Sequence, residues 1–418
     1  MSTDLFTNPH RFGDLDSWRV EALEMHARGP VHWIDQEGFR PFWAVIGHPE
    51  VREIERRPTE FTNEPLAVLE TDEALEIRAA QGVDIRTLIH MDDPDHGKYR
   101  RLTSDWFKPA SVRRLSERID ELSCAALQKL ESLGGKADFY RDVALEFPLQ
   151  VILSILGLPP QDYARMNRLT QELFGAQDPD LQREVSSPEE MVEVLTDFYR
   201  YFSDLTTDRQ ANPSDDLATL IANGTIDDSP IPDLEKMGYY VIIATAGHDT
   251  TAAAMAGGMR AIAEHPEQLR VLQDDPGLIP NGVEEMIRWT SPVRHFMRTA
   301  QADFDIAGTQ INRGDWVYLS YLAANLDPSV FDEPLRFDVT RRNADQQLAF
   351  GYGIHFCLGA QLARMELRSL FGHLVPRLGS LELSGPPTTA KTTFVGGHKT
   401  VPIRYTLIAE KDAGARTA

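Results

Sequence analysis

The chain of 418 residues is 42% hydrophobic and 25% charged, which is the composition of an ordinary globular protein. Its 42 basic and 64 acidic residues give a net charge of −22, which argues against nucleic-acid binding by the molecule as a whole. The two cysteines leave no disulfide framework, residues 1–10 lack the basic and apolar regions of a signal peptide, and no apolar run reaches the ~20 residues of a membrane span. We therefore expect a cytoplasmic protein without a membrane segment, folded as a single domain over residues 1–418 with a short disordered tail at about 409–418.

The first part of the chain predicts a helix, a hairpin and an irregular stretch. Residues 14–28 have the pattern of a helix. Residues 31–35 and 42–46 predict two strands joined by a turn. Residues 60–87 mix apolar and acidic side chains without a clean period, so a mobile lid and a plain surface loop are equally good interpretations.

His96 and Arg100 belong to a strongly basic stretch. They lie four residues apart after a proline, so on a helix they share one face and can donate to one carboxylate; taken alone, the pair is more typical of a solvated helix face. Residues 98–118 contain seven basic and two acidic side chains, a local balance of 7 − 2 = +5. Residues 115–210 then predict successive amphipathic helices. The interruptions fall at 134–135, 159–160 and 178–180.

Residues 232–264 predict one helix of about 33 residues, roughly 50 Å long, which ends at the proline that follows. Its apolar middle changes abruptly to polar residues at 247–251. The Thr250 hydroxyl can bond back to the Ala246 carbonyl, which bends the helix and opens a groove. An acid, Asp249, followed by an alcohol, Thr250, suits proton delivery to bound dioxygen, but a kinked core helix with satisfied polar side chains is an equally good interpretation.

The last third of the chain predicts an ion pair and several strands. Glu285 and Arg288 lie three residues apart, so on a helix they are neighbours. The predicted strands lie at 304–306, 317–321, 381–383 and 401–407.

Residues 350–359 contain the most informative pattern, Phe-x-x-Gly-x-x-x-Cys-x-Gly, followed by a predicted helix. Glycines clear space around Cys357, and the N–H groups and dipole at the helix start are expected to favour the thiolate over the thiol. A thiolate held in this way is what an axial ligand of haem iron requires. A small buried cysteine, or a nucleophile with His355 as its base, are the alternatives that the residues alone leave open.

The full pattern resembles the haem-binding loop of the cytochrome P450 family, and the upstream motifs match that family in order. The resemblance implies a mainly α fold with minor β structure, a long central helix over the haem, and the cysteine loop on the proximal side. The later half is most similar to the terpineol-hydroxylating branch of the family, through residues 244–251, 296–300, 383–387 and 394–397.

The resemblance also implies roles for individual residues. Cys357 ligates the iron of haem b, and Asp249 and Thr250 activate oxygen. The other residues of the haem site are expected to be His96, Arg100, Arg298, His355, Phe350, Gly351 and Gly359. Glu285, Arg288 and Arg341 form a buried structural network. The substrate pocket is expected to include Ile242, Ala246, Val293, Phe296, Phe394 and Val395.

The implied reaction is hydroxylation of a small hydrophobic substrate, such as a monoterpenoid or an alkyl-aromatic compound, with O2 and two electrons from a ferredoxin. An NAD(P)H-dependent ferredoxin reductase would supply electrons to that ferredoxin. The basic stretch would dock it through Arg101, Lys108, Arg113 and Arg114. One alternative is a peroxide-driven peroxygenase, against which the intact Asp249–Thr250 pair argues. The other is a non-enzymatic haem-thiolate sensor, for which His248 is the only candidate distal ligand and no output domain is visible.

Overall fold

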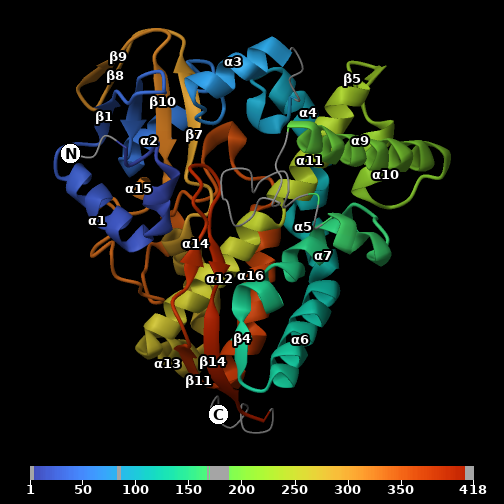
Figure 1. Ribbon diagram of the computed structural model, residues 1–418, viewed down its shortest axis with the longest axis vertical. Helices are drawn as coiled ribbons and strands as arrows, with labels where there is room; N and C mark the ends of the chain where they lie inside the picture. The colour runs from blue at the N-terminus through green and yellow to red at the C-terminus, as the bar shows by residue number, and fades with distance from the viewer. Residues whose placement is uncertain (1–3, 82–85, 167–168, 170–187, 410–418) are drawn as a thin grey trace.

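The computed structural model describes residues 4–81, 86–166, 169 and 188–409. Helices fill the centre and right of the view in Figure 1, and the larger sheet lies at the upper left. Within the described ranges, no helix has the length and apolarity that crossing a membrane requires. The predicted break at 178–180 and the predicted tail from 410 onwards lie outside the described residues.

The helices of the described chain have the following bounds. They are α1 (Leu15–His26), α2 (His48–Glu55), α3 (Asp72–Gln81), α4 (Asp95–Ser104), α5 (Pro109–Val112), α6 (Ser116–Leu133), α7 (Glu146–Ile155), α9 (Pro188–Ala211), α10 (Leu217–Asn223), α11 (Asp233–Ala246), α12 (Asp249–Glu264), α13 (Pro266–Asp274), α14 (Ile279–Thr290), α15 (Tyr321–Ala324) and α16 (Ala360–Leu374). In the centre, α12, α14 and α16 contact one another (Figure 1).

Five strands form the larger sheet, in the order β1-β2-β10-β7-β3. Their bounds are β1 (Val31–Ile34), β2 (Phe42–Val45), β3 (Phe61–Thr62), β7 (His295–Ala300) and β10 (Trp316–Ser320). A second sheet has the order β11-β14-β4, with β4 (Lys136–Asp138), β11 (Leu378–Leu383) and β14 (Pro402–Leu407). The remaining strands pair as short hairpins: β5 (Thr225–Ile226) with β6 (Ser229–Pro230), β8 (Phe304–Ile306) with β9 (Thr309–Ile311), and β12 (Thr388–Thr389) with β13 (His398–Thr400).

The prediction of one continuous helix over 232–264 is wrong, because the chain forms two helices, α11 and α12. Thr250 Oγ1 donates to the Ala246 carbonyl at 3.1 Å, as the sequence predicted. In a regular helix a backbone N–H binds this carbonyl, so the side chain competes with the helical hydrogen bond. Gly247 lies at the break, where a Cβ would come within 2.7 Å of Ile152 and 2.8 Å of the Ile243 carbonyl. The hydroxyl bond and the close packing of Gly247 together divide the helix.

Other elements differ from the sequence prediction in smaller ways. The stretch 60–87 is not irregular throughout, since it contains β3 and α3. Residues 136–138, expected to be part of a helical region, form β4, which pairs with β14. The segment from His295, for which the sequence predicted pocket and haem-site residues but no strand, is the strand β7 in the larger sheet. Tyr321 begins α15 instead of ending a strand.

Candidate functional site

A large cavity lies between the junction of α11 and α12 and the loop that precedes α16. It encloses about 1380 Å³ of space between the side chains, part of it open to solvent. Ala246 and Thr250 line it from the junction, and Phe350 and Cys357 line it from the loop. Two motifs about 100 residues apart in the chain therefore face one space.

The loop before α16 depends on close contact with α2. Gly353 has φ +68°, and a Cβ there would meet the Glu55 carbonyl oxygen at 2.1 Å. Gly351 has φ +67°. Such backbone angles favour glycine. The Cys357 N–H then donates to the Phe350 carbonyl at 2.8 Å, which closes the loop around the sulfur.

The electrostatic surroundings of Cys357 have effects of both signs on the pKa of its thiol. Burial raises the pKa of the thiol, and the N–H groups of Gly359 and Ala360, with the charges of Arg100 and Arg364, lower it by less. The N–H groups at the helix start therefore favour the thiolate, as the sequence predicted, although burial has the larger effect on the pKa.

Three basic side chains line the same cavity: His96, Arg100 and His355. The rings of His96 and His355 lie 4.0 Å apart between centroids, and Arg100 donates to the Phe356 carbonyl at 2.5 Å. Burial and then the charge of Arg100 lower the pKa of His96 to about 4. Burial and then the charge of Arg298 lower the pKa of His355 to about 2. Both imidazoles are therefore neutral at neutral pH.

Arg298 lies next to this group but is not among the residues that line the cavity. Its guanidinium pairs with Glu55 Oε1 at 3.1 Å, and the Tyr321 hydroxyl donates to the same oxygen at 2.6 Å. Burial raises the pKa of Glu55 to about 7, against the opposing effects of Arg298, Tyr321 and the Tyr352 N–H. Arg298 thus has a buried carboxylate partner within the protein.

The residues of the cavity fit a haem group. Nε2 of His355 is buried and has no hydrogen-bond partner among the described residues, so it is available to a propionate. Gly359 lines the cavity, and a Cβ built there would meet no protein atom within 4 Å. The basic side chains and the single sulfur supply donors for carboxylates and a ligand for iron.

The two residues predicted to activate oxygen, Asp249 and Thr250, differ in whether they line the cavity. Thr250 lines the cavity, whereas Asp249 and His248 are not among the lining residues. Asp249 Oδ1 lies 3.0 Å from His248 Nε2, and the His248 side chain is 0% exposed. His248 Nδ1 lies 3.1 Å from the Ala244 carbonyl oxygen. Both ring nitrogens are therefore engaged, which leaves His248 unsuited to the distal ligand role that the sensor alternative requires.

The six predicted pocket residues fall into two groups. Ile242, Ala246, Val293 and Phe296 line the cavity. Phe394 and Val395 do not. Phe394 packs against the ring of Phe296 with centroids 5.4 Å apart, and Val395 forms a β-bridge with Val293. These two residues therefore support the lining, and their place in the substrate pocket stays a prediction.

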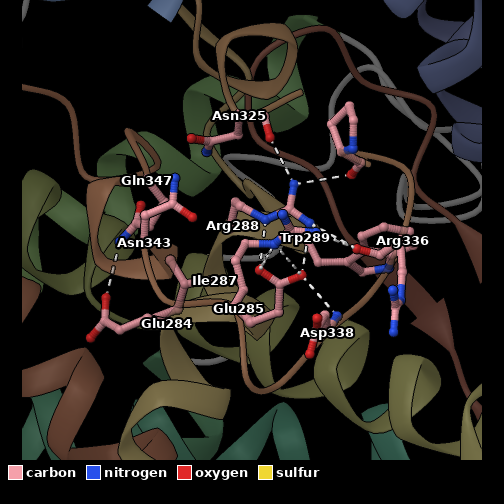
Figure 2. A network of polar contacts seen from close by, with 12 residues as sticks. Glu284, Glu285, Ile287, Arg288, Trp289, Asn325, Arg336, Asp338, Asn343 and Gln347 are labelled. Atoms are coloured by element: carbon pink, nitrogen blue, oxygen red, sulfur yellow. Dashed lines mark hydrogen bonds and ion pairs between the residues drawn. The ribbon is translucent and has the colours of Figure 1, made fainter. Parts of the chain in front are cut away.

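The three residues predicted to form a buried network are in contact, as Figure 2 shows for Glu285 and Arg288. Arg288 donates to the two oxygens of Glu285 at 2.7 and 2.8 Å, and Arg341 Nε lies 3.1 Å from Oε2. The Asp338 N–H donates to Oε1 at 3.0 Å. Every oxygen of the buried carboxylate is therefore satisfied by fixed donors.

The four residues of the predicted docking patch, Arg101, Lys108, Arg113 and Arg114, are all exposed. Arg114 lies over the Trp106 ring at 5.6 Å, and Lys108 pairs with Asp105 at 2.5 Å. The neighbouring helix α5 contacts α16, which begins three residues after Cys357. The patch is thus on the side of the molecule that carries the cysteine loop.

Sequence reasoning missed three residues near the cavity: Glu55, His248 as a partner of Asp249, and Glu366. Glu366 lines the cavity, its Oε2 has no partner within the described chain, and burial raises the pKa of its carboxyl well above the ordinary value. The one available signal for Glu366 was an acid on the apolar face of the helix after Cys357. Glu55 lies 243 residues before Arg298, a separation that no local pattern reveals.

This chain is similar over most of its length to known proteins. A family model described as Cytochrome P450 matches residues 278–404. Cytochrome P450-terp of Pseudomonas sp is 43% identical over 390 residues, which cover 90% of this chain and 91% of the relative. This chain belongs to the cytochrome P450 family. Linalool 8-monooxygenase of Pseudomonas putida is 31% identical over 378 residues, covering 90% and 92% of the two chains.

Solved P450 structures have the same fold. The crystal structure of CYP108D1 from Novosphingobium aromaticivorans DSM12444 has a TM-score of 0.89 and 39% identity, covering 97% of this chain and 98% of that one. CYP268A2 of Mycobacterium marinum in complex with pseudoionone has a TM-score of 0.84 and 30% identity, covering 93% and 94%. The predicted P450 fold and enzyme class are confirmed: the protein is a P450 monooxygenase with a haem cofactor.

Proposed function

We propose that this P450 binds haem b through Cys357 and hydroxylates a small hydrophobic substrate, a monoterpenoid or an alkyl-aromatic compound. The observation that carries the proposal is the single cavity that Cys357, the basic side chains and Thr250 share. When bound, haem supplies an iron centre that activates O2 for insertion of one oxygen atom into a C–H bond. His96, Arg100 and His355 would hold the propionates, with Arg298 next to them.

The cysteine assignment has a matched control in the other cysteine, Cys124, which is exposed on α6. The carbon monoxide spectrum of the reduced protein should carry the signature of a thiolate ligand. Cys357→Ser should abolish that signature, whereas Cys124→Ser should leave it unchanged. If Cys357→Ser kept the thiolate spectrum, the ligand assignment would be wrong.

The substrate class is supported by the apolar lining of the cavity. Ile242, Ala246, Val293 and Phe296 offer shape and apolar contact but no charge, which suits a small hydrocarbon with few polar groups. The names of the relatives, P450-terp and linalool 8-monooxygenase, point to the same class. A titration of the ferric protein with terpineol, linalool and alkyl-benzenes should shift the spin state of the iron that Cys357 would hold. A larger shift with charged or strongly polar compounds would contradict the proposal.

Two groups of this chain would serve the proton chemistry. Thr250 lines the cavity, and its hydroxyl donates to the Ala246 carbonyl, so the lone pairs of the hydroxyl oxygen can accept a hydrogen bond from an ordered water. The Asp249 carboxyl lies behind it with 21% of its side chain exposed, so it can exchange protons with solvent. Product formed with hydrogen peroxide alone, at the rate seen with the electron-transfer partners, would instead favour the peroxygenase alternative.

The electrons would come from a ferredoxin that docks on the patch of Arg101, Lys108, Arg113 and Arg114. A positive surface on a chain of net charge −22 attracts an acidic partner by a steering force that salt screens. Arg113→Glu combined with Arg114→Glu should slow reduction and flatten its dependence on ionic strength. Arg404→Glu, an exposed arginine on β14, is the control. Equal reduction rates in both variants would contradict this docking site.

A further inference from the structure

His248 occupies a position that the proposed function does not use. It lies between the end of α11 and the start of α12, where its backbone has φ −119° and ψ −48°. The side chain is completely buried, and its two nitrogens face two different oxygens: Nδ1 lies 3.1 Å from the Ala244 carbonyl, and Nε2 lies 3.0 Å from Asp249 Oδ1. A buried imidazole with both nitrogens engaged has a restricted set of protonation states.

The hydrogen-bond partners of the His248 ring determine how many protons His248 and Asp249 hold together. A carbonyl oxygen only accepts, so Nδ1 must carry a proton to bond Ala244. The lone pair of Nε2 would then face the lone pairs of the Asp249 carboxylate, unless one further proton lies between them. The pair therefore holds that proton, either as imidazolium with carboxylate or as neutral imidazole with carboxylic acid.

The surroundings favour a shared proton. Burial lowers the pKa of His248, but the charge and hydrogen bond of Asp249 and the Ala244 carbonyl outweigh it, so the pKa is raised. Tyr140 faces Asp249 from the π-helical turn Tyr140–Ala144, and burial followed by the charge of Asp249 raises the pKa of its phenol, so it stays neutral. Asp138 and Arg141 lie next to Tyr140, and α7 contributes the apolar Ile152.

We propose that His248 is a positioning residue that orients Asp249 and stores with it one proton for delivery toward Thr250. This inference rests on the proposed role of Asp249 in oxygen activation. Asp249 gives a proton from its carboxyl oxygen to a water beside Thr250, and that water passes one of its own protons on into the cavity, so its number of O–H bonds is unchanged. The Nε2–H bond of the imidazolium breaks as an Oδ1–H bond forms. Solvent at the exposed part of Asp249 then restores the lost proton to the pair, so the cycle balances.

The direct test is a titration of the His248 ring by NMR in the reduced carbon monoxide complex, which needs no turnover. The ring should bind its second proton with a pKa above that of an ordinary exposed histidine. In Asp249→Asn that raised pKa should be lost, because an amide cannot supply the charge. An ordinary or lowered pKa that does not respond to Asp249→Asn would overturn the inference.

The functional test uses His248→Gln, which keeps a hydrogen-bonding side chain but cannot store a proton. With the carbon monoxide spectrum and substrate-induced spin shift retained, we expect a loss of coupling of electron use to product, because a positioned proton store is missing. The fall should be larger at high pH, where solvent supplies fewer protons. Wild-type coupling at every pH in His248→Gln would overturn the inference.

The two variants also separate this inference from the proposed function. If Asp249→Asn retained full coupling, the proposed role of Asp249 itself would be wrong. If Asp249→Asn lost coupling and His248→Gln did not, only the role of His248 would be wrong. If His248→Gln failed to fold, the NMR titration of the wild type and Asp249→Asn would still decide between the two outcomes.

Discussion

Two buried acid–base clusters of this P450 are built in opposite ways. Around Glu285 the carboxylate is 0% exposed, and Figure 2 shows Arg288 and Asp338 beside it. Arg288, Arg341 and the Asp338 N–H hold its oxygens. At the junction of α11 and α12, Asp249 keeps 21% of its side chain exposed and its partner is a histidine. The first cluster is complete in itself, whereas the second is connected to solvent.

The difference between the clusters lies in what their bases can do. A guanidinium does not lose its proton under any ordinary condition, so the Glu285 cluster holds fixed charges and can only stabilise a structure. An imidazole gains and loses a proton near neutral pH, so the cluster of His248 and Asp249 can move one. Arginine opposite an acid therefore suits a structural role in this fold, whereas histidine opposite an acid allows proton transfer.

The largest expected effect comes from breaking the arginine cluster. Glu285→Gln removes the negative charge and leaves Arg288 and Arg341 buried without their carboxylate, which should cost about 3–5 kcal/mol of the free energy of unfolding. We expect little or no haem-loaded protein, measured by the ratio of haem to protein absorbance and by thermal unfolding. Glu333→Gln is the control: it removes a surface partner of Arg336 whose side chain is 74% exposed, and should change stability by less than about 1 kcal/mol. Similar melting temperatures for the two variants would contradict the structural role.

Glu55 combines features of both clusters, and the dependence of stability on its titration tests the comparison between them. It has an arginine partner, Arg298, but its Oε2 has no partner among the described residues, and burial raises its pKa to about 7 from an ordinary 4.5. A carboxyl whose folded pKa is raised contributes stability that is complete below about pH 4.5 and is lost as the pH rises through about 7. The loss should be on the order of 3 kcal/mol.

The variant that isolates this contribution is Glu55→Gln. The difference in unfolding free energy between the wild type and Glu55→Gln, measured from pH 4 to 8 on the haem-loaded protein, cancels the titration of all other groups. The wild type should lose stability relative to the variant as the pH rises through about 7. A difference that stays constant with pH, or changes in the opposite direction, would show that the pKa of Glu55 is not raised in the folded protein.

Sequence reasoning succeeded where a contact depends on local spacing. The bond from Thr250 to the Ala246 carbonyl and the contact between Glu285 and Arg288 follow from helical spacing, and both are present. The resemblance to the P450 family supplied Arg341, which lies 56 residues from Glu285. The family motifs thus predicted a contact between residues far apart in the chain, which helical periodicity alone does not predict.

What the sequence could not predict depends on distant contacts and on one break in a helix. On a continuous helix, successive side chains point in directions about 100° apart, so His248 and Asp249 would not face each other. The break at Gly247 turns the His248 backbone to φ −119°, and the ring then reaches Asp249.

Thr250→Ala should give the smallest change in stability but a large change in the coupling of electron use to product. Removing the hydroxyl bond to Ala246 should alter the unfolding free energy by about 1 kcal/mol or less, because the hydroxyl bends the helix instead of holding it together. Turnover should nevertheless uncouple, with electrons consumed and peroxide released in place of product. Thr250→Ser, which keeps the hydroxyl, should restore most of the coupling, measured as product formed per NADH consumed. Full coupling in Thr250→Ala, or equal uncoupling in Thr250→Ser, would mean that the hydroxyl serves only the bend of the helix and that the solvent-connected cluster acts without it.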